Sequence, residues 1–282
     1  MIEECFQRSQ NQQKLAGMVF LAYNKICRYS NLAARGCLIQ SGTEYSAPAV
    51  EKKPNTLLDL LLYLLSGIGL FILFSGLLAS ITEAGTLLDS ALRFLLNMFF
   101  LGGTTLLMGV YRRKITWNQL GLHGSRWRFQ FLWIALLLGL AINPIRALLA
   151  LIVQNLWGGG LEALEGRAEV IMGGGFSWPA LIITLIGVGI LIPIAEEMYF
   201  RGLLHNWFAE HFRFWPRVLL SSTIFGLGHF DSIGVVISSF VMGIVIAIAY
   251  ERSKTLWLPI AIHAVTNSGA VLLLYLTMAI ST

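Results

Sequence analysis

Long apolar runs separated by short polar stretches organise the chain from Thr56 onward. A helix needs about 20 consecutive apolar residues to cross the hydrocarbon core of a bilayer. Inside lipid each backbone polar group must be satisfied within its own segment, so runs of this kind predict helices. The pattern predicts about seven spans, and six or eight also fit. The expected spans are 57–81, 91–111, 131–154, 178–205, 216–230, 233–250 and 256–280.

The fifth and sixth expected spans are shorter than the others. They are joined by the polar stretch that begins at His229 and ends at Gly234. Irregular backbone at membrane depth is tolerated only where protein buries it or where it lines a cavity. This connection therefore predicts either a tight helical hairpin or irregular backbone around a cavity.

Composition supports a membrane protein. Of the 282 residues, 56% are apolar and only 12% are charged, and the mean hydropathy is +0.70. A soluble domain carries about 25% charged residues. The predicted fold class is an all-α, polytopic transmembrane helical bundle whose surroundings are the lipid bilayer.

Residues 1–55 differ from the rest of the chain. They are polar and mixed, and the three cysteines of the chain lie here without a zinc-like spacing. The acidic start at Glu3 and Glu4 is unlike a signal peptide. The sequence predicts a disordered cytosolic extension, followed by a transmembrane helical domain at 56–282.

Loops rich in basic residues alternate along the chain with loops that are acidic. The loop at 112–128 and the positions 213–217 and 252–254 carry arginine and lysine, whereas the loops at 82–90 and 157–177 are acidic. Cytoplasmic loops of membrane proteins carry an excess of arginine and lysine. The pattern predicts a cytoplasmic N-terminus and an external C-terminus. The excess of basic residues behind the net charge of +5 is therefore interpreted as a sign of membrane topology, and no nucleic-acid partner is expected.

Two adjacent acids, Glu196 and Glu197, follow the almost purely aliphatic run 181–194. An ionisable group at membrane depth costs about 2.5–3.5 kcal/mol on insertion scales and suggests a functional site. Residues four apart share one face of a helix, so Glu197 and Arg201 are expected to form an ion pair. Glu196 then faces elsewhere and is the predicted chemical group, with Glu197 and Arg201 supporting it. The alternative is a wet helix end, at which both acids merely mark the membrane interface.

Two further polar groups interrupt apolar segments. His229 follows Gly226 and Gly228, which allow a neighbouring backbone or a substrate to approach closely. His263 and Asn267 share one face of the last span and could form a polar wall. The alternative for these residues is structural, because membrane helices use histidine and asparagine for interhelical hydrogen bonds.

Depth brings these groups together. Glu196 and His229 each lie about 12 residues, or about 18 Å, from the cytoplasmic end of their segments, and His263 lies about 10 Å deep. One carboxylate and two imidazoles at similar depth predict a catalytic cavity. Glu196 could act as general base on a water that attacks a carbonyl. Glu196, His229 and His263 could hold zinc or another divalent metal, or the imidazoles and Asn267 could stabilise the oxyanion without a metal.

Three motifs carry a family resemblance: Glu-Glu-x-x-x-Arg at 196–201, Phe-x-x-x-His at 225–229 and His-x-x-x-Asn at 263–267. In this order on successive membrane helices they resemble the CPBP family, also called Abi, of intramembrane endopeptidases. The resemblance, to which the segment Leu120-Gly-Leu122 adds, covers a catalytic core at 178–280. It implies hydrolysis of a peptide bond in or near the membrane, with a peptide or a membrane protein as substrate. It also implies the plasma membrane of a bacterium as location, and the implied catalytic set is Glu196, His229, His263 and Asn267.

Other classes fit less well. The motif His-Glu-x-x-His of zinc proteases and Gly-x-Gly-Asp of membrane aspartyl proteases are absent from the sequence. A proton-coupled or cation-coupled transporter could use the buried acids, but no inverted repeat is evident. A non-catalytic membrane scaffold or immunity protein could retain the site unused. Substitution of Glu196 separates the classes, because a protease would lose cleavage, a transporter would lose flux and a scaffold would keep its phenotype.

Overall fold

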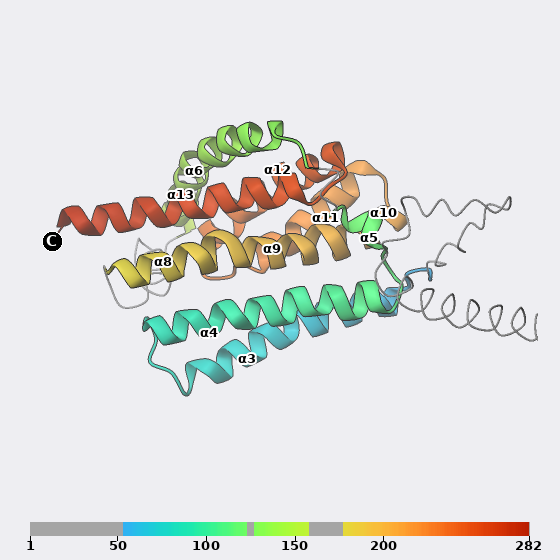
Figure 1. The fold of residues 1–282 in the computed structure, drawn as a ribbon, viewed down its shortest axis with the longest axis horizontal. Coiled ribbons are helices and arrows are strands. Elements are labelled where there is room, and N and C mark those ends of the chain that lie inside the picture. The colour runs from blue at the N-terminus through green and yellow to red at the C-terminus, as the bar shows by residue number, and fades with distance from the viewer. Residues whose placement is uncertain (1–52, 123–126, 158–176, 282) are drawn as a thin grey trace, which may run out of the picture. The chain divides into compact units, whose positions relative to one another are not determined.

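The computed structural model describes residues 53–122, 127–157 and 177–281 (Figure 1). These residues form helices and connecting turns, and no strand occurs among them. The predicted all-α class is thus confirmed. The predicted extension, up to residue 52, and most of the acidic loop, 158–176, lie outside the described residues. Asn55, the last residue of the predicted extension, is described and is part of the folded domain. It is buried and donates to the carboxylate of Glu210.

Most spans consist of several consecutive helical segments, some of them π-helical (η). The π-helical segment η7 lies directly after the paired acids, and π-helical turns within α-helices are frequent at functional sites. In chain order the segments are α2 (Leu57–Leu64), η2 (Leu65–Gly69), α3 (Leu70–Ala79), α4 (Leu87–Asn97), η3 (Met98–Gly102), η4 (Thr105–Tyr111), α5 (Trp117–Leu120), α6 (Gln130–Trp157), α8 (Trp178–Ile186), η6 (Gly187–Leu191), α9 (Ile192–Glu197), η7 (Met198–His205), α10 (Asn206–His211), α11 (Phe214–Leu227), α12 (Ile233–Ser253) and α13 (Trp257–Ser281).

Hydroxyl side chains begin several of these helices. Thr56, Thr86, Ser177 and Ser232 each precede a helix and accept a hydrogen bond from a backbone N–H in its first turn. Such caps satisfy donors that have no partner within the helix. Polar cap residues therefore fix where the apolar runs start as helices.

Within the described residues, six helices are long and apolar enough to cross a membrane: Leu57–Ala79, Leu87–Tyr111, Gln130–Trp157, Trp178–His211, Ile233–Ser253 and Trp257–Ala279. The fifth expected span, 216–230, is not among these six, because α11 has 14 residues and extends only about 21 Å. It ends at Leu227, and His229 lies in the turn before α12 rather than inside a helix. The predicted helical hairpin is present, since α11 packs along α12.

The span Trp178–His211 lies at the centre of the contacts. Its segments pack against the second span, α11, α12 and α13, and Figure 1 shows α8 and α9 between α4 and α13. The first span packs on the second, and α6 packs on α12 and α13. The paired acids therefore belong to the helix with the most neighbours.

The basic ends of the spans meet at one end of the bundle. Arg217 at the start of α11 pairs with Glu251 at the end of α12, at 2.6 Å. The ring N–H of Trp207 donates to the backbone carbonyl of Thr56, which links the end of the fourth span to the start of the first. Thr255 donates to the carbonyl of Gly121, after the second span. This arrangement agrees with the alternation of basic loops in the sequence.

Gly121 is needed at this junction. Its φ is +68°, in the left-handed region, and a Cβ there would lie 2.7 Å from the Cα of Thr255. Only glycine adopts this conformation without strain while another backbone approaches so closely. The segment Leu120-Gly-Leu122 thus packs the loop after the second span against the start of the last one.

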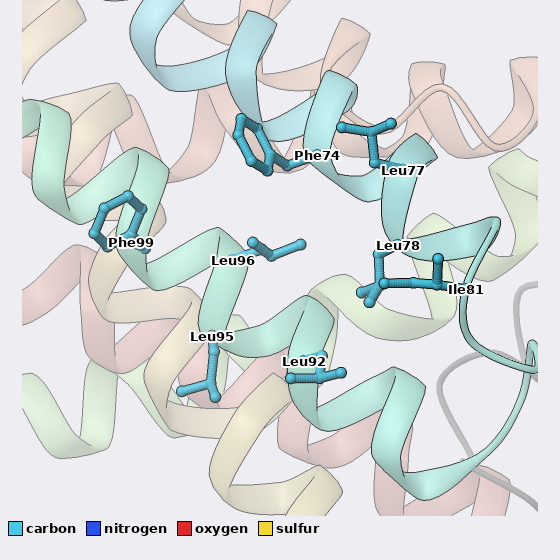
Figure 2. A pocket seen from close by; sticks show the side chains of 8 residues that line it. All are labelled: Phe74, Leu77, Leu78, Ile81, Leu92, Leu95, Leu96 and Phe99. Atoms are coloured by element: carbon cyan, nitrogen blue, oxygen red, sulfur yellow. The ribbon is translucent and has the colours of Figure 1, made fainter.

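An apolar cleft of about 420 Å³ opens between α3 and α4 (Figure 2). Its lining holds no ionisable side chain, and most of the lining residues are exposed. It is therefore separate from the polar groups that the sequence singles out. Its lining residues are Phe74, Leu77, Leu78, Ile81, Leu92, Leu95, Leu96 and Phe99.

A buried polar cluster joins three helices at the basic end. The imidazole of His205 contacts the hydroxyl of Ser221 at 2.9 Å and the carboxylate of Glu251 at 2.8 Å. Glu251 also pairs with Arg217 and, at 2.7 Å, with Lys254. The carboxylate of Glu251 is thus the common partner of three cationic or titratable groups.

We expect Glu251→Gln to lower the free energy of unfolding by about 1–3 kcal/mol, because it weakens several hydrogen bonds of one buried group. The loss stays in this range because Lys254, and in part Arg217, reach water when they lose the carboxylate. Thermal unfolding in detergent measures it, with the exposed neighbour Arg252→Gln as control. An unchanged unfolding temperature for Glu251→Gln would show that the cluster contributes nothing to stability.

Candidate active site

The two acids of α9 are buried inside the bundle. Glu196 is 7% exposed and Glu197 is fully buried. Each has one oxygen, Oε2, without a hydrogen-bond partner among the described residues. A buried carboxylate oxygen without a donor is costly and suggests a functional group.

Glu197 is held by a cation on its own helix. Arg201 Nη1 lies 2.9 Å from Glu197 Oε1, so the ion pair predicted from the i,i+4 spacing is confirmed. The guanidinium also donates to the carbonyl of Gly243 on α12, at 3.1 Å, and its centre lies 4.4 Å from the centre of the Phe225 ring. Arg201 therefore fixes Glu197 and ties the central span to α11 and α12.

His263 of α13 lies between the two carboxylates. Its Nδ1 is 2.7 Å from Glu197 Oε1, and its Nε2 is 3.8 Å from Glu196 Oε2. An ionised carboxylate can only accept hydrogen bonds, so Nδ1 carries a proton. A carboxylate in this position orients the imidazole and leaves Nε2 facing Glu196. The pairing of His263 with Glu197 could not be read from spacing, because 66 residues separate them.

The gap between His263 and Glu196 is the chemical centre of the arrangement. A distance of 3.8 Å is too long for a direct hydrogen bond and is one that a single water can bridge. The structure therefore brings together four predicted residues: Glu196, Glu197, Arg201 and His263.

His229 lies beside this group rather than within it. Its Nδ1 donates to the carbonyl of Phe225 at 2.8 Å, which fixes the tautomer of the ring. The Phe225 ring lies 4.7 Å from the His229 ring and 5.7 Å from the His263 ring, measured between centres. Phe225 thus lies next to both imidazoles.

Asn267 lies one turn after His263 on α13. Its side-chain amide donates to the carbonyl of Val188 at 3.1 Å, in the π-helical segment η6. The amide has two N–H groups, and this bond uses one of them. The predicted polar wall of His263 and Asn267 therefore faces the central span.

The sequence analysis missed one residue of the site, Asn97. This last residue of α4 is buried and donates to Glu196 Oε1 at 3.2 Å. It lies 99 residues from Glu196, so no motif spacing connects the two. The only available signal was an isolated amide in an apolar span, between Leu96 and Met98.

The predicted metal ligands Glu196, His229 and His263 do not converge as a metal site. Across residues 53–122, 127–157 and 177–281, no three histidine, cysteine, aspartate or glutamate side chains are grouped so that they could hold an ion. In both histidines Nδ1 is bonded, in His263 to Glu197 and in His229 to a backbone carbonyl, so Nε2 is the ring nitrogen that a metal would use. Both versions of the sequence analysis, with and without a metal, therefore stay predictions.

Comparison with known proteins identifies the same part of the chain. Residues 178–269 match the family described as type II CAAX prenyl endopeptidase Rce1-like. Over 95 residues the chain is 35% identical to "Putative membrane peptidase YdiL" of Bacillus subtilis (strain 168), covering 34% of this chain and 37% of that protein. The segment with the three motifs thus lies within the match to this endopeptidase family. Residues 178–269 belong to the CPBP family.

The chain also resembles an "Uncharacterized 24.3 kDa protein" of Escherichia coli, at 32% identity over 91 residues, 31% of this chain and 42% of that protein. The matches therefore span less than half of either relative. No solved structure matches the chain. Together with the six helices long enough to span, the CPBP match makes this chain an integral membrane protein.

Proposed function

We propose that the protein is an intramembrane endopeptidase in which Glu196 activates a water for attack on a peptide bond. The observation that carries this proposal is the unpartnered Oε2 of Glu196, buried 3.8 Å from Nε2 of His263. An acceptor and an imidazole nitrogen at this separation suit a bound water. The match of this segment to CAAX prenyl endopeptidases supports the reaction class.

In the proposed reaction the water gives a proton to Glu196 Oε2 while its oxygen bonds to the carbonyl carbon. The developing oxyanion receives a hydrogen bond from Asn267 of α13, whose amide has a second N–H beside the one that binds Val188. His229, in the turn after α11, adds a second one from Nε2 in its doubly protonated form, because Nδ1 already donates to Phe225. Glu196 then returns the proton to the departing amine as the carbon–nitrogen bond breaks. Glu197 and Arg201 hold His263 in place and take no proton themselves.

The substrate is a peptide segment in or beside the bilayer. Glu196 lies about 22 Å along the helix axis from the last residue of α10 at the basic end, so the site lies at membrane depth. Because positive loops mark the cytoplasmic side, we place the basic end and the N-terminus in the cytoplasm and the C-terminus outside. For a bacterial chain this membrane is the plasma membrane.

The proposal is tested by incubating the purified protein in detergent with a library of synthetic transmembrane peptides, with and without a metal chelator. We expect new peptide termini, found by mass spectrometry, and the same yield in chelator, because the donor set does not gather around an ion. Loss of cleavage in chelator and its recovery with added zinc would replace this metal-free mechanism by the metal-bound alternative. If none of the peptides is cleaved, the endopeptidase assignment fails.

A further inference from the structure

Asn97 touches the group that carries the proposed chemistry and comes from outside the matched segment. It belongs to the second span, whereas the family match begins at residue 178. Its Nδ2 donates to Glu196 Oε1 at 3.2 Å, and its own Oδ1 is buried without a hydrogen-bond partner among the described residues. An ionised carboxylate only accepts, so the amide must present its N–H to Glu196.

The hydrogen bond between Asn97 and Glu196 lies between two places where the second span packs closely on the central span. One turn before Asn97, the ring of Phe94 packs so closely on Gly187 of the central span that a Cβ there would lie 2.1 Å from a ring carbon. Five residues after Asn97, Gly102 packs against Ala195, the residue before Glu196. The two spans are therefore locked together above and below the amide. Positioning groups on packed helices are more precise than those on loops.

The hydrogen bond distinguishes the two oxygens of Glu196. It occupies Oε1, and the remaining Oε2 is the oxygen nearest to Nε2 of His263. We propose that Asn97 is a positioning residue that turns the Glu196 carboxylate so that Oε2 meets the attacking water. This inference rests on the proposed hydrolysis and adds a residue from the second span to it.

A purely structural role makes a different prediction. Membrane helices use asparagine for interhelical hydrogen bonds, and losing such a bond lowers stability without a specific effect on the chemical step. Thr104 offers the matched case, because it is buried on the same span and donates to the hydroxyl of Ser66 at 3.3 Å. Thr104→Val removes one interhelical hydrogen bond and leaves Glu196 untouched.

We expect Asn97→Leu, which keeps the volume and removes the donor, to lower kcat about 10²-fold with KM unchanged, since a small misplacement of a catalytic group has this effect. Thr104→Val should keep the wild-type kcat. If the leucine variant does not fold, Asn97→Ser replaces it, because the hydroxyl is too short to reach Glu196. An Asn97 variant that folds and keeps the wild-type kcat would overturn the inference.

The double variant Asn97→Leu with Glu196→Gln separates this inference from the proposed function. If Asn97 acts through Glu196, the double variant is no slower than Glu196→Gln alone. Additive losses would mean that Asn97 acts independently of Glu196 and would overturn the inference while the hydrolysis stands. If Glu196→Gln itself cleaves like the wild type, the proposed function fails, and this inference fails with it.

Discussion

Replacement of Glu196 by glutamine is expected to lower kcat/KM for peptide cleavage by about 10³-fold, within the range for loss of a general base. This corresponds to about 4 kcal/mol of transition-state stabilisation. Glutamine has the same shape, and its carbonyl oxygen can still accept the hydrogen bond from Asn97. Only the ability to take a proton from water is removed. Cleavage rates of the purified protein at several peptide concentrations give the value.

The matched control is Glu210→Gln, the same change in the same span at the exposed end of α10. It should retain the wild-type rate, and thermal unfolding should show that both variants are folded. Equal cleavage by Glu196→Gln and the wild type would remove Glu196 from the chemistry. A drop in both variants would point to a general effect of the substitutions on this span.

Replacement of Arg201 by methionine is expected to lower the free energy of unfolding by about 3–5 kcal/mol, the cost of leaving a buried charge without its partner. Glu197 is fully buried, and Arg201 is the only lysine or arginine paired with it in the described part of the chain. The variant should also lose cleavage, because Glu197 holds Nδ1 of His263. Denaturant or thermal unfolding in detergent measures the first effect.

The chain supplies a matched ion pair whose acid is equally buried but whose arginine is partly exposed. Arg93 and Asp89 have the same i,i+4 spacing and the same 2.9 Å distance, but the arginine side chain is 24% exposed rather than 1%. Arg93→Met should cost less, because Asp89 keeps the hydrogen bond from Thr82 and lies in the favourable first turn of α4. Adding Glu197→Gln to Arg201→Met should recover stability and leave cleavage lost. If Arg201→Met is no less stable than Arg93→Met, burial does not control the strength of this pair.

Local rules predicted much of the fold and one contact of the site. Apolar runs predicted the helices, since a segment in lipid has no other way to satisfy its backbone. The contact between Glu197 and Arg201 followed from the spacing of four residues on one helix. The end of α11 at Leu227 was missed, because the run of mostly apolar residues continues through Gly226 and Gly228 and placed the end of the expected span at residue 230.

Contacts between helices were beyond the reach of such rules. Depth estimates put Glu196, His229 and His263 at similar levels, but they do not give the rotation of each helix about its own axis. The structure consequently pairs His263 with Glu197 at 2.7 Å and leaves His229 beside Phe225. Asn97 was missed for the same reason, since nothing in a single sequence says which span packs on which.

The central claim is that water held by Glu196 hydrolyses a peptide bond. Its most direct test is cleavage of a transmembrane peptide in water enriched in heavy oxygen, by the wild type and by Glu196→Gln. The account predicts one heavy oxygen in the new carboxyl terminus with the wild type, and almost no product with the variant. Heavy oxygen incorporated at equal rates by both proteins, or product that carries none, would contradict it.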